Sequence, residues 1–577
     1  MEDGNNSQDT TVAAEAPWSA RVLAWADRHR WWLFAGVVVL YALGFTGRWR
    51  VAPDTALYME LGRNLSEGKG FVYHGVKHNW YEPGLPYVIG LSFRWFGEDN
   101  YVPLALFMVA CGFVSLALVY HLFRVHAGRP TAVVMTVLLA AAETFYRYCF
   151  QIVTDTPFLV GIMGFLLGYE ALVRREDAEA RERPRRWGPW GGWALIAAGT
   201  VVMCAFRPTI ITFLGALAVA TLYHLVRGPD RVRHVLIAAL AVGSVLAFRA
   251  ADPRRSTPGE AAHREATLKT LLTEKRGWAL ERSFKRFIPE MLSEHTPEAV
   301  MGIEVGTPQD QILSVATIAL GLGLVTRRVL WGAWVAATVA QMAFWLPRER
   351  YFLPILPLLQ FAVWRAALWL EVRTPEPGER TPSTVQGRLG FIAIASLLLV
   401  PNLVQDANFI YEQHWLSRGV SLTDRRDPTG SALMEMGELI RTNVGEEDAV
   451  LAEPARQLTY FSRRKVVAPP TSLRQPPSEK MLQRVRADLL SARQLYAVMP
   501  ETWDIPHVKN LMDELGMELG PEVGRVAQGP WKDRPQPTLV LHRLVPKGTG
   551  QSSPATRPAG TSPATVPRGR SASPPSE

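Results

Sequence analysis

The chain has 577 residues, of which 48% are apolar and 20% are charged, and its formal net charge is +9. Soluble proteins carry roughly 25% charged residues, and here long apolar runs also alternate with short arginine clusters. This pattern excludes a soluble enzyme, a disordered chain and a fibre. The 3 cysteines all lie inside apolar runs, which excludes a disulfide framework and a cysteine-based zinc site. Composition predicts a polytopic membrane protein whose arginines set its orientation rather than bind nucleic acid.

The apolar runs predict about eleven transmembrane helices, since a span needs about 20 mostly apolar residues. The first is 31–47, and Arg21, Arg28 and Arg30 before it place the N-terminal segment 1–30 in the cytoplasm. This first span has no small-residue cleavage site, so we expect it to be retained. Ten further candidate spans extend the predicted transmembrane domain over 31–404. They lie near 101–123, 131–147, 157–173, 190–206, 209–226, 234–250, 309–326, 329–346, 351–370 and 388–404.

The run 83–96 is predicted to be an interfacial or re-entrant helix. It has about 14 residues, fewer than a span requires, and it contains two prolines and Arg94. If it does not cross, the basic loop 174–186 and the other arginine clusters between spans fall in the cytoplasm, as the positive-inside tendency demands. The part of the chain after the last span then lies outside.

Three regions outside the membrane follow from this topology. They are the loop 48–100, the short turn near 148–156 and the segment 251–308. Beyond the last span lies 405–545, whose composition is that of a soluble domain. Amphipathic stretches at 431–443 and 479–490 alternate there with β-like runs at 448–452, 465–468, 494–499 and 538–545, which predicts a small external α/β domain. Residues 546–577 are rich in Pro, Ser, Thr and Gly, which predicts a disordered tail. The fold class is therefore an all-α polytopic membrane protein with a small C-terminal external α/β domain.

Three acidic residues lie at the predicted external edge of the membrane, where charge is costly and often functional. Asp54 opens an amphipathic helix at 54–68, Asp155 stands in the turn before Pro157, and Glu82 precedes the interfacial helix. The two aspartates also suit helix caps, and Glu82 suits a surface acid. Because all three share one side and one depth, we treat them as candidate catalytic residues. They are also candidate ligands of a divalent cation such as Mg²⁺ or Mn²⁺, although no ligand signature is present.

Basic residues gather at the same edge, against the usual orientation bias. Arg207 lies between two spans, and Arg350 and Tyr351 precede a proline-broken helix; Arg63 is on the amphipathic helix, and Lys77 and His78 are in the same loop. Lipid headgroups explain such residues in part. An anionic ligand explains them better, because arginine binds phosphate through two parallel hydrogen bonds.

Acids and cations together at headgroup depth suit a particular reaction. A sugar on a polyprenyl phosphate has its scissile bond at this level, its phosphate leaves readily when cations hold it, and the acceptor hydroxyl needs a carboxylate base. Aromatic residues of the first loop suit contacts to the sugar or acceptor, although an aromatic belt at the interface also explains them. They are Tyr58, Tyr73, Trp80 and Tyr81, with His78 beside them.

The sequence resembles the multispanning glycosyltransferases that use lipid-phosphate sugars, including the protein O-mannosyltransferase and aminoarabinose-transferase branch. The resemblance covers roughly residues 20–370 and rests on four runs in order: PDTALYMELGRNLSEGKGF, YEPGLPYVIGLSFRWFG, TDTPF and RYFLPILPLL. It implies that Asp54 is the candidate base, that Asp155 is the acid of the second external loop, and that Arg350 and Tyr351 lie near the lipid phosphate. The aminoarabinose branch has Glu-Lys-Pro-Pro where this chain has Glu82-Pro83-Gly84, so its phosphate-binding lysine is missing.

The leading hypothesis is an inverting glycosyltransferase in the cell membrane, with a polyprenyl-phosphate sugar as donor and a hydroxyl of a protein, lipid or glycan as acceptor. Inversion follows from the resemblance and from a single displacement. Another lipid-linked glycan transferase or ligase is the alternative within enzymes. A lipid or solute transporter or flippase is the alternative from another class, and it predicts ionisable residues near mid-span and broken helices in matched halves.

Overall fold

The computed structural model describes residues 17–547 with some gaps. The gaps are 50–52, 79–80, 99, 174–188, 229, 253–280, 304–306, 345–346, 372–384, 415–427, 454, 469–482, 484, 486, 488, 501–510, 514 and 528–537. The basic loop 174–186 and nearly all of the predicted tail 546–577 therefore lie outside the described residues.

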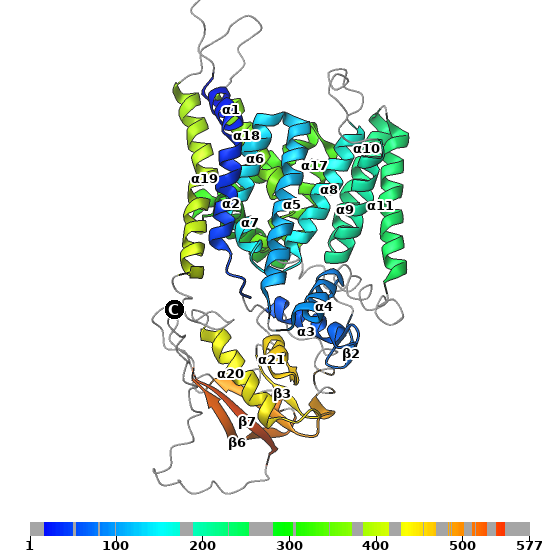
Figure 1. Cartoon of the computed structure of the whole chain (residues 1–577), viewed down its shortest axis with the longest axis vertical. Coiled ribbons are helices and arrows are strands. Elements are labelled where there is room, and N and C mark those ends of the chain that lie inside the picture. Colours follow the sequence, from blue (N-terminus) through cyan, green and yellow to red (C-terminus); the bar gives the residue numbers. More distant parts are fainter. Residues whose placement is uncertain are drawn as a thin grey trace, which may run out of the picture.

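A bundle of apolar helices makes up the larger part of the molecule (Figure 1). Each of the eleven predicted spans overlaps at least one helix of this bundle. Among the described residues, six helices are long and apolar enough to cross a membrane, the longest being α5 and α19. Four others, α2, α6, α9 and α17, are apolar but shorter, so the count of eleven spans stays a prediction. The helices are α2 (Arg30–Gly44), α5 (Val102–Ala127), α6 (Arg129–Ala140), α8 (Asp155–Val173), α9 (Pro189–Phe206), α10 (Ile210–Arg227), α11 (Arg231–Ala251), α16 (Pro308–Gly323), α17 (Val329–Phe344), α18 (Leu356–Glu371) and α19 (Val385–His414).

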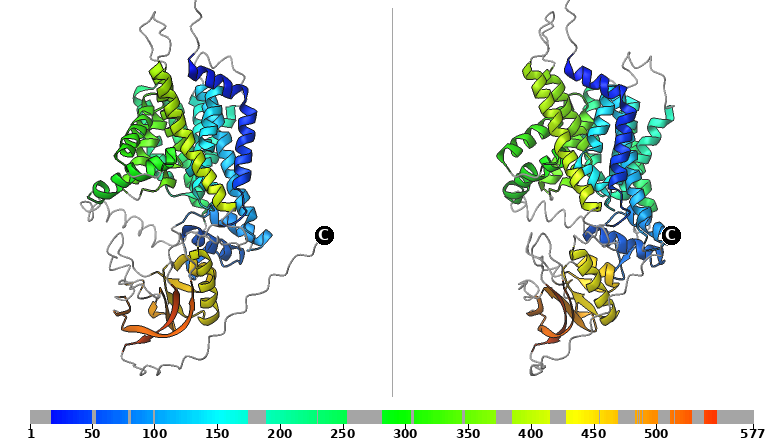
Figure 2. Two further views of the ribbon diagram at one scale, coloured as in Figure 1. Left: turned by 90° about the vertical axis from the view of Figure 1, so that its left-hand side faces the viewer. Right: turned by 60° about the vertical axis from the view of Figure 1, so that its left-hand side comes forward.

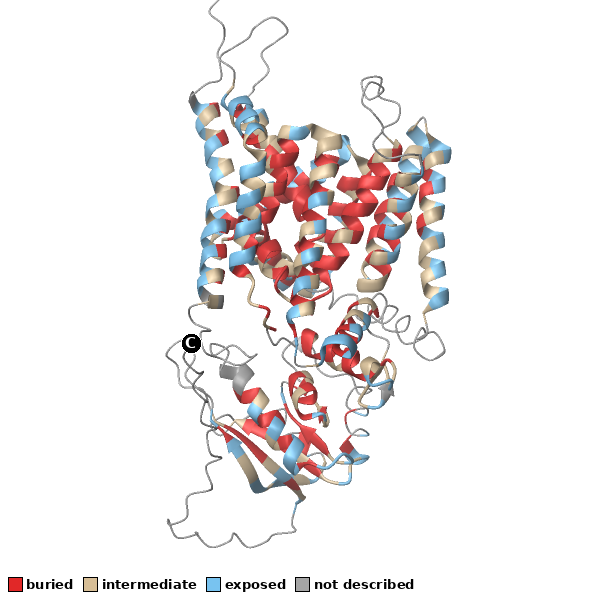
Figure 3. Ribbon diagram, viewed as in Figure 1, coloured by how far each residue is buried: buried red, intermediate tan, exposed pale blue. Residues whose placement is uncertain are grey.

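The helices differ in how much of their surface is buried, and this distinguishes a central helix from outer ones that expose apolar side chains. In α8, 83% of the apolar window is buried, against 22% in α11 and in α19, and Figure 3 shows the buried residues concentrated in the middle of the bundle. Large apolar side chains such as Trp32, Ile211 and Leu246 are exposed on the outer helices. Exposed apolar surface of this extent is unfavourable in water and suits a hydrocarbon environment.

One predicted span is wrong as a single helix. The predicted span 131–147 is divided into α6, which ends at Ala140, and a short helix α7 (Glu143–Tyr148). The backbone N–H of Glu143 donates to Asn402 Oδ1 of α19 at 2.8 Å, so a side chain from a distant helix supplies the acceptor that the new N-terminus needs. The predicted span 351–370 likewise begins later, because a 3₁₀ turn η7 (Glu349–Phe352) precedes α18.

Two short helices, α3 (Pro53–Ser66) and α4 (Gly84–Phe96), lie at one end of the bundle (Figures 1 and 2). They pack closely because a Cβ on Gly62 would lie 2.4 Å from Ile89, which only glycine avoids. The 13 residues of α4 span about 20 Å at 1.5 Å per residue, which is shorter than the hydrocarbon core of about 30 Å. A small hairpin of β1 (Val72–Tyr73) and β2 (Val76–Lys77) joins the two helices.

The described part of the predicted loop 251–308 is helical. It comprises the π-helical turns η4 (Ser283–Phe287) and η5 (Met291–His295), the single turn α14 (Ile288–Glu290) and α15 (Thr296–Met301). A further 3₁₀ turn, η6 (Leu324–Thr326), follows α16, and a helix α1 (Trp18–Arg28) precedes α2. The backbone N–H groups of Trp18 and Ser19 at the start of α1 donate to the Glu371 carboxylate at the end of α18, at 2.5 and 2.8 Å.

The chain after α19 forms an α/β unit on the far side of α3 and α4 from the bundle (Figure 2). Its sheet has the order β4-β3-β5-β7-β6, parallel among the first three strands and antiparallel thereafter. The edge strand β6 is absent from the sequence prediction because its Gly and Pro residues disfavour a central strand and suit an edge. The elements are α20 (Pro428–Asn443), β3 (Ala449–Leu451), α21 (Ala455–Ser462), β4 (Lys465–Val467), β5 (Leu495–Pro500), β6 (Met517–Val526) and β7 (Leu539–Pro546).

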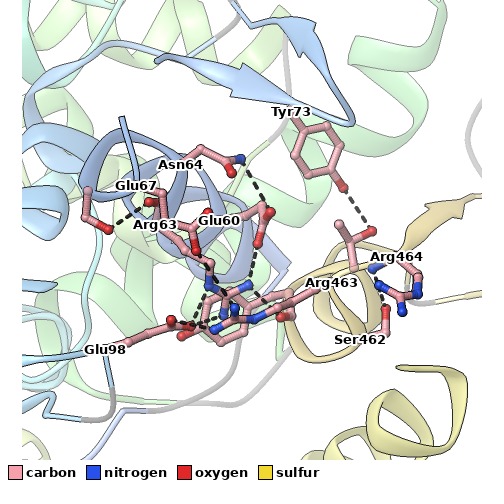
Figure 4. Close-up of polar contacts among 12 residues, drawn as sticks. Glu60, Arg63, Asn64, Glu67, Tyr73, Glu98, Ser462, Arg463 and Arg464 are labelled. Carbon is pink, nitrogen blue, oxygen red and sulfur yellow. Dashed lines mark hydrogen bonds and ion pairs between the residues drawn. The ribbon is translucent and has the colours of Figure 1, made fainter. Parts of the chain in front are cut away.

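A joint centred on Arg63 of α3 connects this unit to the rest of the chain (Figure 4). Arg63 is 4% exposed, forms ion pairs with Glu60 and Glu98, and donates to the backbone oxygen of Tyr460 in α21 at 2.9 Å. Its guanidinium also lies 4.0 Å from the centroid of the Tyr460 ring. The Tyr460 hydroxyl in turn is 2.9 Å from that of Tyr101. Every polar group of Arg63 is thus engaged within the protein.

We expect Arg63→Met to destabilise the protein by up to about 3–5 kcal/mol, because the substitution leaves the partly buried carboxylates of Glu60 and Glu98 without their partner. The measurement is the midpoint of thermal unfolding of the purified chain. Lys69→Met is the control, since the Lys69 side chain is 62% exposed in its pair with Glu67 and such pairs contribute about 0–1 kcal/mol. An unchanged midpoint for Arg63→Met would contradict the structural role.

Candidate functional site

The carboxylate of Asp54, in the first turn of α3, is the centre of the site. Its Oδ2 accepts a hydrogen bond from Arg350 at 2.8 Å, and its Oδ1 accepts one from Arg456 at 2.8 Å and one from the Tyr81 hydroxyl at 3.1 Å. The helix begins at Pro53, so Asp54 lies inside the first turn rather than at the N-cap. The side chain serves this cluster, which joins residues up to 402 positions apart.

Arg350 connects Asp54 to the second aspartate. It lies in η7, which exists because Pro354 and Pro357 follow it and delay the start of α18. Burial lowers the pKa of Arg350, but the charges of Asp155, Tyr351 and Asp54 outweigh burial and raise it overall. The Arg350 Nη2 also lies 3.3 Å from the Tyr351 hydroxyl. A guanidinium held between two carboxylates stays fully charged.

Asp155 begins α8 and forms an ion pair with Arg207, which directly follows α9. The pair forms because α8 and α9 approach closely through glycines. A Cβ on Gly161 would lie 2.8 Å from the backbone oxygen of Gly199, and one on Gly168 would lie 2.7 Å from that of Gly192. Such small-residue contacts are typical of tightly packed membrane helices. They place the two helix ends, and hence the two charges, side by side.

Aromatic rings line the cations and Asp54. The guanidinium of Arg207 lies 5.0 Å from the Tyr351 ring, and that of Arg456 lies 5.7 Å from the Tyr81 ring. Tyr58 is buried and packs edge-on against Tyr81 at 5.0 Å, and the His78 ring stacks on Tyr81 at 5.6 Å. The predicted sugar or acceptor contacts Tyr58, Tyr81 and His78 are therefore brought together, whereas Trp80 lies outside the described residues.

Two of the predicted residues, Glu82 and Arg63, form ion pairs with residues outside the Asp54 cluster. Glu82 is 1% exposed and forms a two-bond pair with Arg249 of α11, at 2.8 and 3.1 Å. Arg63 belongs to the joint with α21, and its role as a phosphate ligand stays a prediction. Lys77 is half-buried on β2 of the hairpin. The shared position in the loop 48–100 therefore did not predict which residue each charged side chain pairs with.

The sequence prediction missed Arg456, which comes from α21 of the C-terminal unit. Besides Asp54, its Nη1 contacts the Tyr81 hydroxyl at 3.1 Å. The run ARQLTYFS carries no motif, and nothing in it points to a residue 402 positions earlier. Only the docking of α21 on α3, fixed by the Arg63 joint, brings it to the site.

Opposing effects set the pKa of Asp54. Burial raises this pKa. The hydrogen bond and charge of Arg350, the charge of Arg456 and the hydrogen bond from the Tyr81 hydroxyl lower it by more than burial raises it, so the pKa of Asp54 lies below its ordinary value. Asp54 is ionised at neutral pH and is held by cations. The carboxylate oxygens of Asp54 and Asp155 accept hydrogen bonds from their arginine partners, and the predicted Mg²⁺ or Mn²⁺ at these acids stays a prediction.

Comparison with family models matches part of the chain. Residues 78–251 match the family model described as dolichyl-phosphate-mannose-protein mannosyltransferase. No curated protein sequence matches the chain. The matched stretch contains Asp155 and Arg207, and the predicted resemblance to multispanning glycosyltransferases that use polyprenyl-phosphate sugars is confirmed there. The match indicates a membrane enzyme of the glycosyltransferase type.

Solved structures of two proteins align with much of this chain at low sequence identity. ArnT from Cupriavidus metallidurans in the apo state is 14% identical, with a TM-score of 0.48, and the alignment covers 88% of this chain and 97% of that one. The same protein bound to undecaprenyl phosphate is 13% identical, with the same TM-score and coverage. The oligosaccharyltransferase AglB from Archaeoglobus fulgidus, in complex with an inhibitory peptide and a dolichol-phosphate, is 13% identical at a TM-score of 0.48, with 81% of this chain and 69% of that one covered.

Proposed function

We propose that the chain transfers a sugar from a polyprenyl phosphate to an acceptor hydroxyl, with inversion at the anomeric carbon. The observation that carries the proposal is the alternation of Asp54 and Asp155 with three arginines around one point. Arg350 contacts Asp54 and lies near Asp155, Arg207 pairs with Asp155, and Arg456 pairs with Asp54. Phosphate recognition and proton removal are thereby available side by side.

In the proposed step, the acceptor oxygen forms a bond to the anomeric carbon as the bond from that carbon to the phosphate oxygen breaks. The electron pair leaves with the polyprenyl phosphate, and Asp54 takes the acceptor proton. The phosphate changes from a diester of charge −1 to a monoester of about −1.5 to −2. Arg350 and Arg207 therefore stabilise the transition state more than the bound donor, which is what accelerates a reaction.

The arginine contacts also explain how Asp54 becomes a base. In the free protein its pKa is held low by Arg350, Arg456 and Tyr81 against the effect of burial, so it binds protons weakly. A donor phosphate competes with Asp54 for Arg350. When the guanidinium turns to the phosphate, the largest opposing cause is removed and the pKa of Asp54 rises. Donor binding thus prepares the base.

The alternatives make different predictions for the same purified protein. A lipid-linked glycan ligase moves a larger group from its lipid, and a flippase moves the intact lipid without breaking it. We propose the monosaccharide donor because the family model that matches residues 78–251 is described by dolichyl-phosphate mannose. The sugar and the acceptor are not specified by the residues of the site.

The test is to incubate the purified chain with radiolabelled polyprenyl-phosphate sugars and to measure the label released from the lipid. Asp54→Asn is the first variant. The amide keeps the size of the side chain but cannot accept the proton, so we expect turnover to fall by about 10²–10⁴-fold while donor still binds. The control is Asp513→Asn, which neutralises an exposed acid of the C-terminal unit. If Asp54→Asn keeps more than about a third of wild-type turnover, Asp54 is not the base.

Arg350→Ala is expected to raise the donor KM by about tenfold or more, because charge-assisted hydrogen bonds contribute roughly 1.5–3 kcal/mol. Arg348→Ala is the matched control, since it removes an exposed arginine two residues earlier. Steady-state kinetics over a range of donor concentrations gives both constants. A donor KM equal to that of the control would assign Arg350 a structural role only.

We also propose that the N-terminal segment is cytoplasmic and that α3, α4 and the C-terminal unit lie outside, in the cell membrane. The positive-inside tendency of the arginine loops supports this orientation. Alkaline phosphatase, whose disulfides form only outside the cytoplasm, should be active when fused after His414 and inactive when fused after Gly128. The reverse pattern would invert the topology.

A further inference from the structure

A cluster of three side chains beside the site has the composition of a metal centre. It contains His295, Glu298 and Glu349, and one ligand atom from each lies within 4.8 Å of the other two. His295 ends η5, Glu298 is in α15, and Glu349 begins η7 directly before Arg350. The cluster thus joins the segment 291–301 to the turn that carries the central arginine of the site.

The separations suit a shared cation better than hydrogen bonds. His295 Nδ1 lies 3.7 Å from Glu298 Oε2 and 3.7 Å from Glu349 Oε2, which is too long for a hydrogen bond. This buried nitrogen has no hydrogen-bond partner among the described residues. Donor atoms bound at about 2.0–2.2 Å to one tetrahedral ion lie about 3.3–3.6 Å apart. The two distances from His295 Nδ1 are therefore close to the spacing of metal ligands.

The other oxygen of each carboxylate has its own partner. The Tyr148 hydroxyl donates to Glu349 Oε1 at 2.7 Å, and Arg147 Nη1 lies 3.9 Å from Glu298 Oε1. These partners orient the carboxylates so that both Oε2 atoms face His295 Nδ1. Outer partners that fix the orientation of ligands are typical of metal sites.

Charge and burial favour an ion as well. The side chains of His295, Glu298 and Glu349 are 12%, 15% and 17% exposed, so two carboxylates face each other in a nearly dry environment.

We infer that His295, Glu298 and Glu349 bind one divalent transition-metal cation. The imidazole ligand favours zinc or manganese over the purely oxygen-liganded magnesium or calcium. Three protein ligands leave at least one coordination position for water or another ligand. The ion would tie α15 to η7 and so fix the turn that presents Arg350. This site is distinct from Asp54, Glu82 and Asp155, the acids from which the sequence predicted a cation site.

The test is metal binding by the purified, full-length chain after removal of metals with a chelator. The chain is dialysed separately against zinc chloride and manganese chloride, and bound metal is measured by mass spectrometry. We expect about one ion per chain for one of the two metals. The loss of an outer partner typically weakens metal binding by about 10–100-fold. His295→Ala and Glu298→Gln each remove a ligand itself, so each should weaken metal binding by more than that. Glu294→Gln, which neutralises an exposed acid next to His295, should bind as the wild type does.

Thermal unfolding separates lost ligands from lost folding. Without metal, Glu298→Gln should unfold near the wild-type temperature, and added metal should raise the unfolding temperature of the wild type but not of the variant. Wild-type protein that binds no ion above background overturns the proposal, as does unchanged binding in either ligand variant. Because neither measurement needs turnover, the result does not depend on the proposed function.

Discussion

The pairing of the Asp54 carboxylate with two guanidiniums is the interaction on which the arrangement of the site depends. It joins three parts of the chain that are remote in sequence: α3, the turn η7 before α18, and α21 of the C-terminal unit. A half-buried carboxylate pays for its desolvation only when such partners are present. The position of Arg350 therefore follows from that of Asp54, and a ligand that takes either arginine changes the electrostatics of the acid at once.

Hydropathy predicted the helical bundle well, because lipid exposure requires long apolar helices whatever their tertiary packing. The same reasoning placed Asp54, Asp155, Arg207 and Arg350 at one edge, and the structure brings these four together. A helix end at the membrane edge limits where a charge can lie, so chain order alone gives its depth. The interfacial helix 83–96 corresponds to α4 for the same reason, since its length is set by the sequence.

What the sequence could not predict depends on lateral packing. Glu82 and Arg63 have the expected depth, but Arg249 of α11 holds the first and Tyr460 of α21 receives the second. The position along the membrane normal does not determine which neighbouring helix supplies the partner of a charged side chain. The break between α6 and α7 was hidden for a related reason, because the acceptor for the new helix start is Asn402, on a helix far along the chain.

The C-terminal unit is part of the site rather than an attachment, because α21 supplies Arg456. The Arg456 side chain is 41% exposed, and a pair so close to solvent contributes only about 0–1 kcal/mol to docking. The buried Arg63 ion pairs and the stacking of Trp49, Tyr101 and Tyr460 must therefore hold the unit in place. Under the proposed function, Arg456 can therefore exchange the Asp54 carboxylate for a ligand without loosening the joint. The residue proposed to contact the ligand, Arg456, and the residue that docks the unit, Tyr460, thus lie toward opposite ends of α21.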